Sequence, residues 1–155
     1  MQRRAAVIVL LVALAAAVLL YLRWRAGEAA QVRRTIEVMR QAGEAKDAER
    51  FMSYLSPSYR DHLGFQYELV ARLVEIVTRG PEKYRVTLRG LRVSVKGKSA
   101  VARMNASVTI DRGEPLTGDL LVELRKEGGR WRVTSSAGWQ DFFADESPRR
   151  APGRV

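Results

Sequence analysis

An uninterrupted apolar run near the N-terminus constrains this chain more than any other feature. Residues 5–22 read AAVIVLLVALAAAVLLYL, eighteen positions without a charged side chain, with two arginines close to each end. As an α-helix this run is about 27 Å long, close to the hydrocarbon thickness of a bilayer. The sequence therefore predicts a single membrane span over residues 5–22, within an N-terminal anchor of residues 1–25.

Several features favour an uncleaved anchor over a signal peptide. The Ala-x-Ala inside the run, at residues 15–17, is followed by five more apolar positions, whereas a cleavage site ends the apolar stretch. Tyr21 and Trp24 suit the aromatic belt at a membrane interface. A core helix of a soluble protein would need protein on every face of this apolar cylinder, which the remaining 130 residues can hardly provide.

The flanking arginines are similar in number on both sides and do not separate the two topologies. We expect the short N-terminus to stay inside and the C-terminal domain to be exported from the inner (cytoplasmic) membrane, because long domains translocate largely regardless of charge. The chain contains no cysteine, so its fold depends on a hydrophobic core alone. Residues 26–146 are the right size for one domain, and the polar, proline-containing tail 147–155 is expected to be disordered.

The first half of this domain has helical periodicity. Val32, Ile36 and Met39 fall at i, i+4 and i+7, which predicts a helix ending near Gly43. Asp47 is a suitable N-cap for a second, shorter helix. Residues 56–61, with Ser and Pro first and Asp last, have the pattern of a capping box and predict a further helical turn.

A third helix is predicted over residues 66–79, where apolar residues form a broad face. Gly80 then suits a left-handed C-cap, with Pro81 behind it. The members of the apolar face are Leu69, Val70, Leu73, Ile76 and Val77.

The second half changes to a period of two over residues 84–95, 100–110, 120–124 and 131–133. The alternation slips by one residue at Gly90, as it does at a β-bulge. Each connection between the segments contains glycine, which favours hairpins and an antiparallel meander. We predict an α+β fold: an N-terminal transmembrane helix, then three helices packed on a curved four-stranded antiparallel sheet to make a cone.

Residues 28–143 resemble the nuclear transport factor 2-like superfamily, also called SnoaL-like or cystatin-like. The order of elements carries the resemblance, together with EAKDAERFMSYLSPSYRD at 44–61 and KEGGRWRVTSSAGW at 126–139. The resemblance implies the cone fold, shared by isomerases, hydrolases and dehydratases and by non-catalytic binding and assembly domains. Bitopic envelope members, in type IV secretion assembly and Mce lipid transport, are similar in plan to this chain.

The inward strand positions of the predicted cone carry no Asp, Glu, His, Lys or Arg. General acid–base chemistry lacks its residues there, so we expect no enzymatic activity and name no catalytic residue. The small side chains of the alanine row either let a helix approach closely or leave an apolar pocket, and close packing is the simpler interpretation. The expected lining of such a pocket is Tyr84, Ala100, Ala102, Met104, Ala106 and Trp131.

Asp61 and His62 are the remaining acid–base candidates. Neighbouring residues in a helix point about 100° apart, so the two cannot act jointly on one atom. We interpret Asp61 as a capping carboxylate and His62 as an exposed side chain. With one histidine, no cysteine and no carboxylate cluster, neither a metal site nor a cofactor is expected.

The net charge is +10, and residues 81–138 hold twelve basic against six acidic residues. Most of this excess is predicted on the outward face of the sheet, at Arg85, Arg89, Arg92, Lys96, Arg103, Arg125, Arg130 and Arg132. Such a face either blunts edge pairing or attracts anionic headgroups, acidic envelope polymers or an acidic protein. Nucleic acid is not an expected partner, because interleaved aromatic residues are missing.

Trp139, Phe142 and Phe143 fall at i, i+3 and i+4, and we expect them to close one end of the core rather than dock a partner. Together these observations predict a non-catalytic, membrane-anchored binding or assembly domain of the cell envelope. It would act through its basic sheet face or its concave mouth, with an envelope protein or a second copy as partner. The alternative is a carrier or enzyme for an apolar small molecule bound in the cone.

Overall fold

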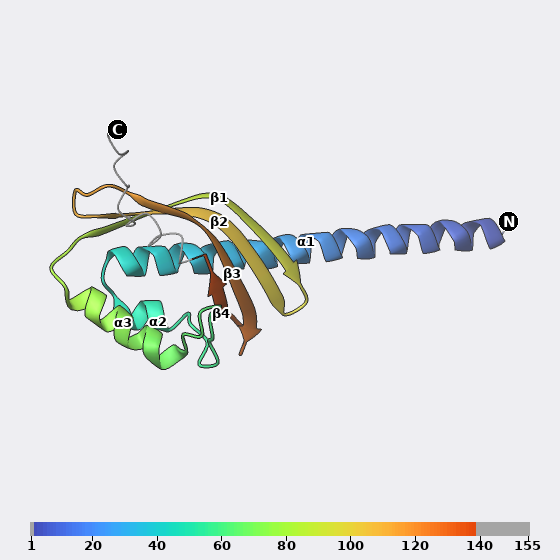
Figure 1. The fold of residues 1–155 in the computed structure, drawn as a ribbon. Coiled ribbons are helices and arrows are strands. Elements are labelled where there is room, and N and C mark those ends of the chain that lie inside the picture. The colour runs from blue at the N-terminus through green and yellow to red at the C-terminus, as the bar shows by residue number, and fades with distance from the viewer. Residues whose placement is uncertain (1, 139–155) are drawn as a thin grey trace, which may run out of the picture.

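The computed structural model describes residues 2–138, and only the backbone of residues 2–9 and 25. The predicted α+β architecture is confirmed: helices come first and an antiparallel sheet follows (Figure 1). The helices are α1 (Gln2–Glu44), α2 (Ala48–Met52) and α3 (Tyr67–Arg79); the strands are β1 (Tyr84–Lys96), β2 (Ser99–Ile110), β3 (Leu116–Glu127) and β4 (Arg130–Ala137).

The sheet is a meander in the order β1-β2-β3-β4, with every neighbouring pair antiparallel. The predicted bulge at Gly90 is confirmed, because the β1–β2 register shifts between Arg89 and Arg92 and Gly90 has a φ of 64°. Glycine adopts this conformation without steric strain. A second register shift, after Glu123 in the β3–β4 pair, has no counterpart in the sequence pattern.

The apolar run and the first helix of the domain are one continuous helix of 43 residues, α1. Its C-terminal half lies along the concave face of the sheet, whereas its N-terminal half projects away from the domain (Figure 1). Val32 is completely buried in a core that also contains Ile36, Ala100, Ala102 and Ala106. Small side chains at this contact let helix and sheet approach closely.

No helix forms at residues 56–61, contrary to the prediction. A single turn, in which Tyr59 N donates to Ser56 O (2.9 Å), interrupts a segment that lies beside β4, where Ser56 N donates to Val133 O (2.8 Å) and Arg60 N donates to Thr134 O (3.1 Å). The outer edge of β4 presents backbone groups that need partners, and pairing them outweighs the local capping pattern.

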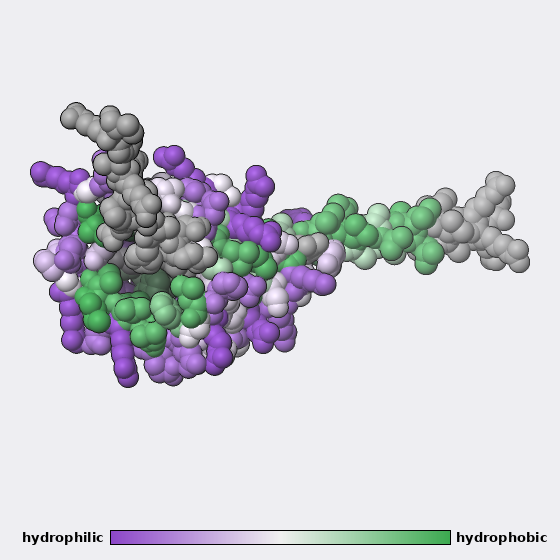
Figure 2. Space-filling view, viewed as in Figure 1, coloured by the Kyte–Doolittle hydropathy of each residue, from purple (hydrophilic) through white to green (hydrophobic). Residues whose placement is uncertain are grey.

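The predicted left-handed cap at Gly80 is also wrong: its φ of −63° and ψ of 157° are extended. The cause is Pro81, which restricts the preceding residue to extended conformations. The apolar face of α3 lies mostly exposed in the described structure, with Ile76 67% exposed. Figure 2 shows hydrophobic side chains gathered over this helix.

Two predictions fall on residues that the structure does not describe. These are the closure of the core by Trp139, Phe142 and Phe143, and the disorder of the tail 147–155.

Candidate functional site

Seven of the eight basic residues predicted for the outward face of the sheet are exposed. Arg130 does not lie over that face: its guanidinium is 5.6 Å from the centroid of the Tyr54 ring, and it borders a small hollow beside α1. Arg132 is half-buried, and its Nε is buried without a hydrogen-bond partner among the described residues. The bulge at Gly90 keeps Arg89 and Arg92 on the same face although they are three positions apart. The outward side of the sheet therefore presents a mainly cationic surface, shared with the exposed acidic residues Asp119 and Glu123. It is here called the basic face and is made of Arg85, Arg89, Arg92, Lys96, Arg103, Arg125 and Arg132.

Strand register brings like charges together on the basic face. Arg92 is the cross-strand partner of Arg103, and Arg125 is the partner of Arg132. Directly opposed like charges destabilise a sheet by a few tenths to about 1 kcal/mol per pair. An anion between these pairs would remove the repulsion.

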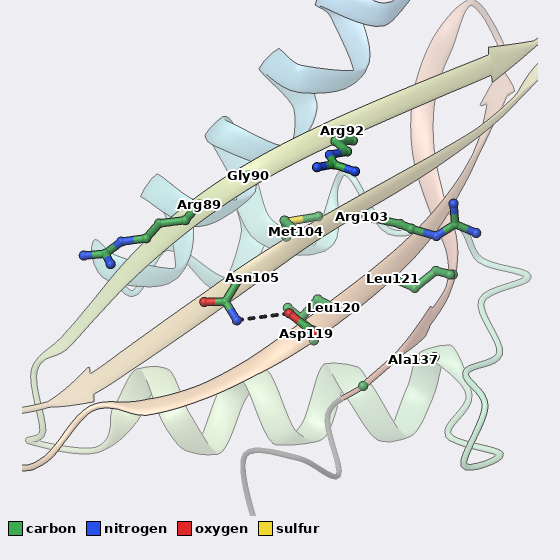
Figure 3. Close-up of a pocket in the computed structure, with 11 residues that line it drawn as sticks. Arg89, Gly90, Arg92, Arg103, Met104, Asn105, Asp119, Leu120, Leu121 and Ala137 are labelled. Atoms are coloured by element: carbon green, nitrogen blue, oxygen red, sulfur yellow. Dashed lines mark hydrogen bonds between the residues drawn. The ribbon is translucent and has the colours of Figure 1, made fainter.

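A shallow groove of about 670 Å³ lies on the basic face (Figure 3). Among its lining residues, Asp119 is the one carboxylate, and it accepts a hydrogen bond from Asn105 Nδ2 (3.0 Å). None of the groove arginines forms an ion pair within residues 2–138. The groove arginines are Arg89, Arg92 and Arg103. The groove is thus a cationic site with one carboxylate already engaged.

The expected pocket lining lies instead in or beside the hydrophobic core. Met104, Trp131 and the three alanines at 100, 102 and 106 are buried, and Tyr84 is half-buried. Burial raises the pKa of the Tyr84 phenol. Of these residues only Met104 also borders the outer groove, and Trp131 borders a smaller surface hollow beside α1.

The prediction that no inward strand position carries an ionisable side chain is wrong at Lys126, which continues the inward series of Leu120, Val122 and Leu124 and lies opposite Trp131. Together with Glu28 it forms a buried charge cluster that joins α1 to the sheet. The Glu28 carboxylate is 4% exposed and accepts hydrogen bonds from Lys126 Nζ (2.6 Å) and from Trp131 Nε1 (2.9 Å). The Lys126 ammonium lowers the pKa of Glu28, with help from the indole N–H and against the effect of burial. Two features of the sequence point to this cluster. Glu28 lies one helical turn before Val32 on the same face of the helix, and a buried Trp N–H needs a hydrogen-bond acceptor.

The lowered pKa of Glu28 predicts a pH dependence of stability. A carboxyl group whose pKa is depressed by folding contributes stability that is complete above its unfolded value of about 4.5 and is lost as the pH falls through the folded value. We expect the free energy of unfolding to fall between about pH 6 and pH 3, and Glu28→Gln to flatten this decline. Denaturant unfolding at each pH measures the free energy of unfolding.

The control Glu37→Gln removes an exposed carboxyl from α1 and should flatten the pH dependence less than Glu28→Gln does. An equal effect of the two substitutions would contradict the prediction.

Asp61 and His62 do not form a joint site. Asp61 is buried, and its Oδ1 accepts hydrogen bonds from Leu63 N (2.9 Å) and Phe65 N (2.7 Å), so it caps the turn that leads to α3. The His62 side chain is exposed. Nearby, the Tyr59 hydroxyl bonds Ser136 Oγ (2.6 Å), and burial raises the pKa of Tyr59. Within the described residues no group of three His, Cys, Asp or Glu side chains is placed to hold a metal ion.

Helix α1 is the one described helix long and apolar enough to cross a membrane. A signal sequence has similar length and composition, so these properties alone do not distinguish a membrane anchor from a cleaved signal sequence. Its apolar stretch is not buried against the domain, and Leu10 and Leu20 are largely exposed. Tyr21 and Trp24 have ring centroids 6.3 Å apart at the domain-side end of this stretch.

Three helices on a curled four-stranded antiparallel meander define the nuclear transport factor 2-like cone fold. Solved structures support this at the level of fold. An NTF2-like protein of unknown function from Pseudomonas putida matches with a TM-score of 0.67 and 18% identity, covering 73% of this chain and 86% of that one. A putative dehydratase of the NTF2-like family from Streptomyces avermitilis matches with a TM-score of 0.64 and 16% identity, covering 72% and 95%.

A third similar structure is Bd1075 of Bdellovibrio bacteriovorus, with a TM-score of 0.63 and 16% identity over 69% of this chain. The matched region spans only 39% of Bd1075, so there the fold is one part of a longer protein. No family model matches the sequence, and no curated protein matches it. At these identities the comparisons establish the fold, and function has to be argued from the surfaces of this chain.

Proposed function

We propose that this protein is a membrane-anchored, non-catalytic binding domain of the cell envelope that recognises an acidic partner through the basic face. The observation that carries the proposal is the groove on that face. Its arginines have no ion-pair partner among the described residues, and Arg92 and Arg103 oppose each other across the β1–β2 ladder. A site with several clustered cations and one engaged carboxylate attracts anions.

The anchor part of the proposal is supported by the exposed apolar stretch of α1. Leaving a leucine side chain in water rather than burying it costs about 2 kcal/mol, and Leu10, Leu11, Leu14, Leu19 and Leu20 are all more than half exposed. A bilayer removes that cost. We propose that residues 5–22 span the inner membrane and that the domain is exported. A reporter fused to the C-terminus tests on which side of the membrane the domain lies.

Substitution in the groove tests the recognition part of the proposal. Arg92→Ala with Arg103→Ala in the full chain, held in a nanodisc of neutral lipid, should weaken binding of a fluorescent oligoglutamate peptide about tenfold, or about 1.4 kcal/mol. The reason is the loss of the two facing guanidinium groups. Fluorescence anisotropy at several salt concentrations measures the affinity and its salt dependence.

The matched control is Arg60→Ala with Arg72→Ala, which removes two exposed arginines from outside the sheet. It should leave the affinity within about twofold, because neither arginine lines the groove and exposed charges are screened by salt. Equal loss in both double variants would mean that net charge alone attracts the peptide. The groove would then not be the site.

A carrier or enzyme for an apolar small molecule is the second candidate. The exposed apolar face of α3 favours it, at Leu69, Leu73, Ile76 and Val77, as does the putative dehydratase among the similar structures. Native mass spectrometry of the purified chain discriminates the two. An apolar molecule that co-purifies with the chain and is lost in Leu73→Gln supports the carrier. The variant Arg92→Ala with Arg103→Ala should then bind that molecule like the unchanged chain.

A further inference from the structure

We infer that the end of the sheet nearest the apolar stretch of α1 docks on anionic phospholipid headgroups. This inference rests on the proposed membrane span, and it concerns a different part of the surface from the groove. The docking surface consists of four exposed cations at the β1–β2 and β3–β4 turns: Lys96, Lys98, Arg125 and Arg130. Of these, Arg130 also lies over the Tyr54 ring, 5.6 Å from its centroid.

The Glu28 cluster fixes which end of the sheet lies near the anchor. Glu28 bonds Lys126 and Trp131 beside the β3–β4 turn, and Lys126 N donates to Lys98 O (2.8 Å) in the β1–β2 turn. Both turns therefore lie at the level of Glu28, on the side from which α1 leaves the domain (Figure 1). At the opposite end, Glu44 Oε1 accepts a hydrogen bond from Val86 N near the start of β1.

The distance along α1 places these turns close to a membrane surface. Glu28 is six residues beyond Leu22, the last residue of the apolar run, and all of them are helical. Six residues of α-helix rise about 9 Å, comparable to a Debye length of about 8 Å at physiological ionic strength. The cations of the turns therefore lie within reach of the surface potential of an anionic bilayer.

Charge is distributed unevenly along the sheet. At the anchor-side turns five basic residues, Lys126 and the four of the docking surface, accompany two acidic ones, Glu28 and Glu127. Lys126 is paired with Glu28, and the four cations of the docking surface form no ion pair in the described structure. At the far end three basic residues accompany three acidic ones. These are Lys83, Arg85 and Arg112 with Glu82, Asp111 and Glu114. The uncompensated positive end is the one that faces the anchor.

A single fluorescent label reads out this docking in the full chain. The chain contains no cysteine, so Ser99→Cys at the exposed first residue of β2, next to the β1–β2 turn, gives one unique labelling site. We expect acrylamide to quench the label less in vesicles containing about a third phosphatidylglycerol than in pure phosphatidylcholine, because each surface cation contributes about 1 kcal/mol to association with anionic lipid. Raising the salt to about 1 M should abolish the difference.

Lys96→Ala with Lys98→Ala should lower the equilibrium between docked and free domain on the order of 25-fold, about fivefold per charge, and the protection should disappear. Lys83→Ala with Arg112→Ala, the same charge change at the far end of the sheet, should keep it. Equal protection in neutral vesicles, or equal loss in both double variants, would overturn the inference.

Flotation of the same samples separates this inference from the anchor. A chain that floats with neutral vesicles but shows no lipid-dependent protection keeps the anchor and overturns the docking. The chain could instead fail to float with neutral vesicles but bind anionic ones at low salt through Lys96 and Lys98. That result would refute the anchor and support the docking. A chain that floats with neither refutes both.

Discussion

Trp131→Ala is expected to lower the free energy of unfolding of the domain by about 3–5 kcal/mol. Trp131 is 2% exposed, and its ring fills the core between α1 and the sheet. Truncation leaves a cavity and also removes the indole N–H that the buried Glu28 carboxylate accepts at 2.9 Å. Domains of this size are stable by only about 5–15 kcal/mol, so the variant should be close to unfolding.

Far-ultraviolet circular dichroism during denaturant unfolding, in the same detergent or nanodisc for all variants, measures this loss. Trp131→Phe keeps most of the ring volume and removes the hydrogen bond, so it should lose about 1–3 kcal/mol, the penalty of one unsatisfied buried partner. Trp24→Ala is the matched control, because Trp24 is about half exposed on α1 outside the core, and should change stability by less than about 0.5 kcal/mol. A stable Trp131→Ala variant would show that the Glu28 cluster does not hold α1 on the sheet.

Gly138→Ala is the second change with a large expected effect. Gly138 follows β4 with a φ of 101°, and an added Cβ would lie 1.9 Å from Asp119 O and 3.3 Å from Leu120 Cα. Backbone conformational strain contributes about 1–3 kcal/mol and forced displacement of packed atoms about as much again. We therefore expect a loss of about 3 kcal/mol or more, measured by the same unfolding experiment.

Gly97→Ala isolates the conformational part of this effect. Gly97 has a φ of 59°, but nothing lies within 4 Å of its added Cβ. It should lose only about 1–2 kcal/mol, the penalty of the left-handed conformation for a residue with a Cβ. Gly138 and Asp119 both line the groove on the basic face, so Gly138→Ala should also weaken oligoglutamate binding while Gly97→Ala does not. Similar losses of stability in the two variants would contradict the close approach to β3.

Local patterns predicted the elements of this fold well. The period of two predicted the strands, and the slip at Gly90 predicted the bulge, because the side-chain alternation of a strand and the φ of a single residue are local properties. The same alternation predicted which residues occupy the basic face. The pattern could not predict which of them oppose each other, because the Arg92–Arg103 pair depends on the register between strands.

Patterns failed where a segment meets a distant partner. The capping pattern at residues 56–61 favours a helix, but only one turn forms, and the backbone on both sides of it donates hydrogen bonds to the edge of β4. The apolar periodicity of α3 predicts its face correctly, yet does not predict that most of this face lies exposed in the described structure. Local propensity is a weak preference, and tertiary hydrogen bonds override it.

The sequence by itself determined the apolar N-terminal stretch, the helix-then-sheet order and the cationic side of the sheet, because each follows from periodicity and charge along a short segment. Only the tertiary structure decided that the stretch and the first domain helix are one helix, that Glu28 joins it to Lys126 and Trp131, and that the basic turns lie at the anchor end. These contacts join residues about a hundred positions apart. Their free energy depends on burial and distance in space, which no local pattern encodes.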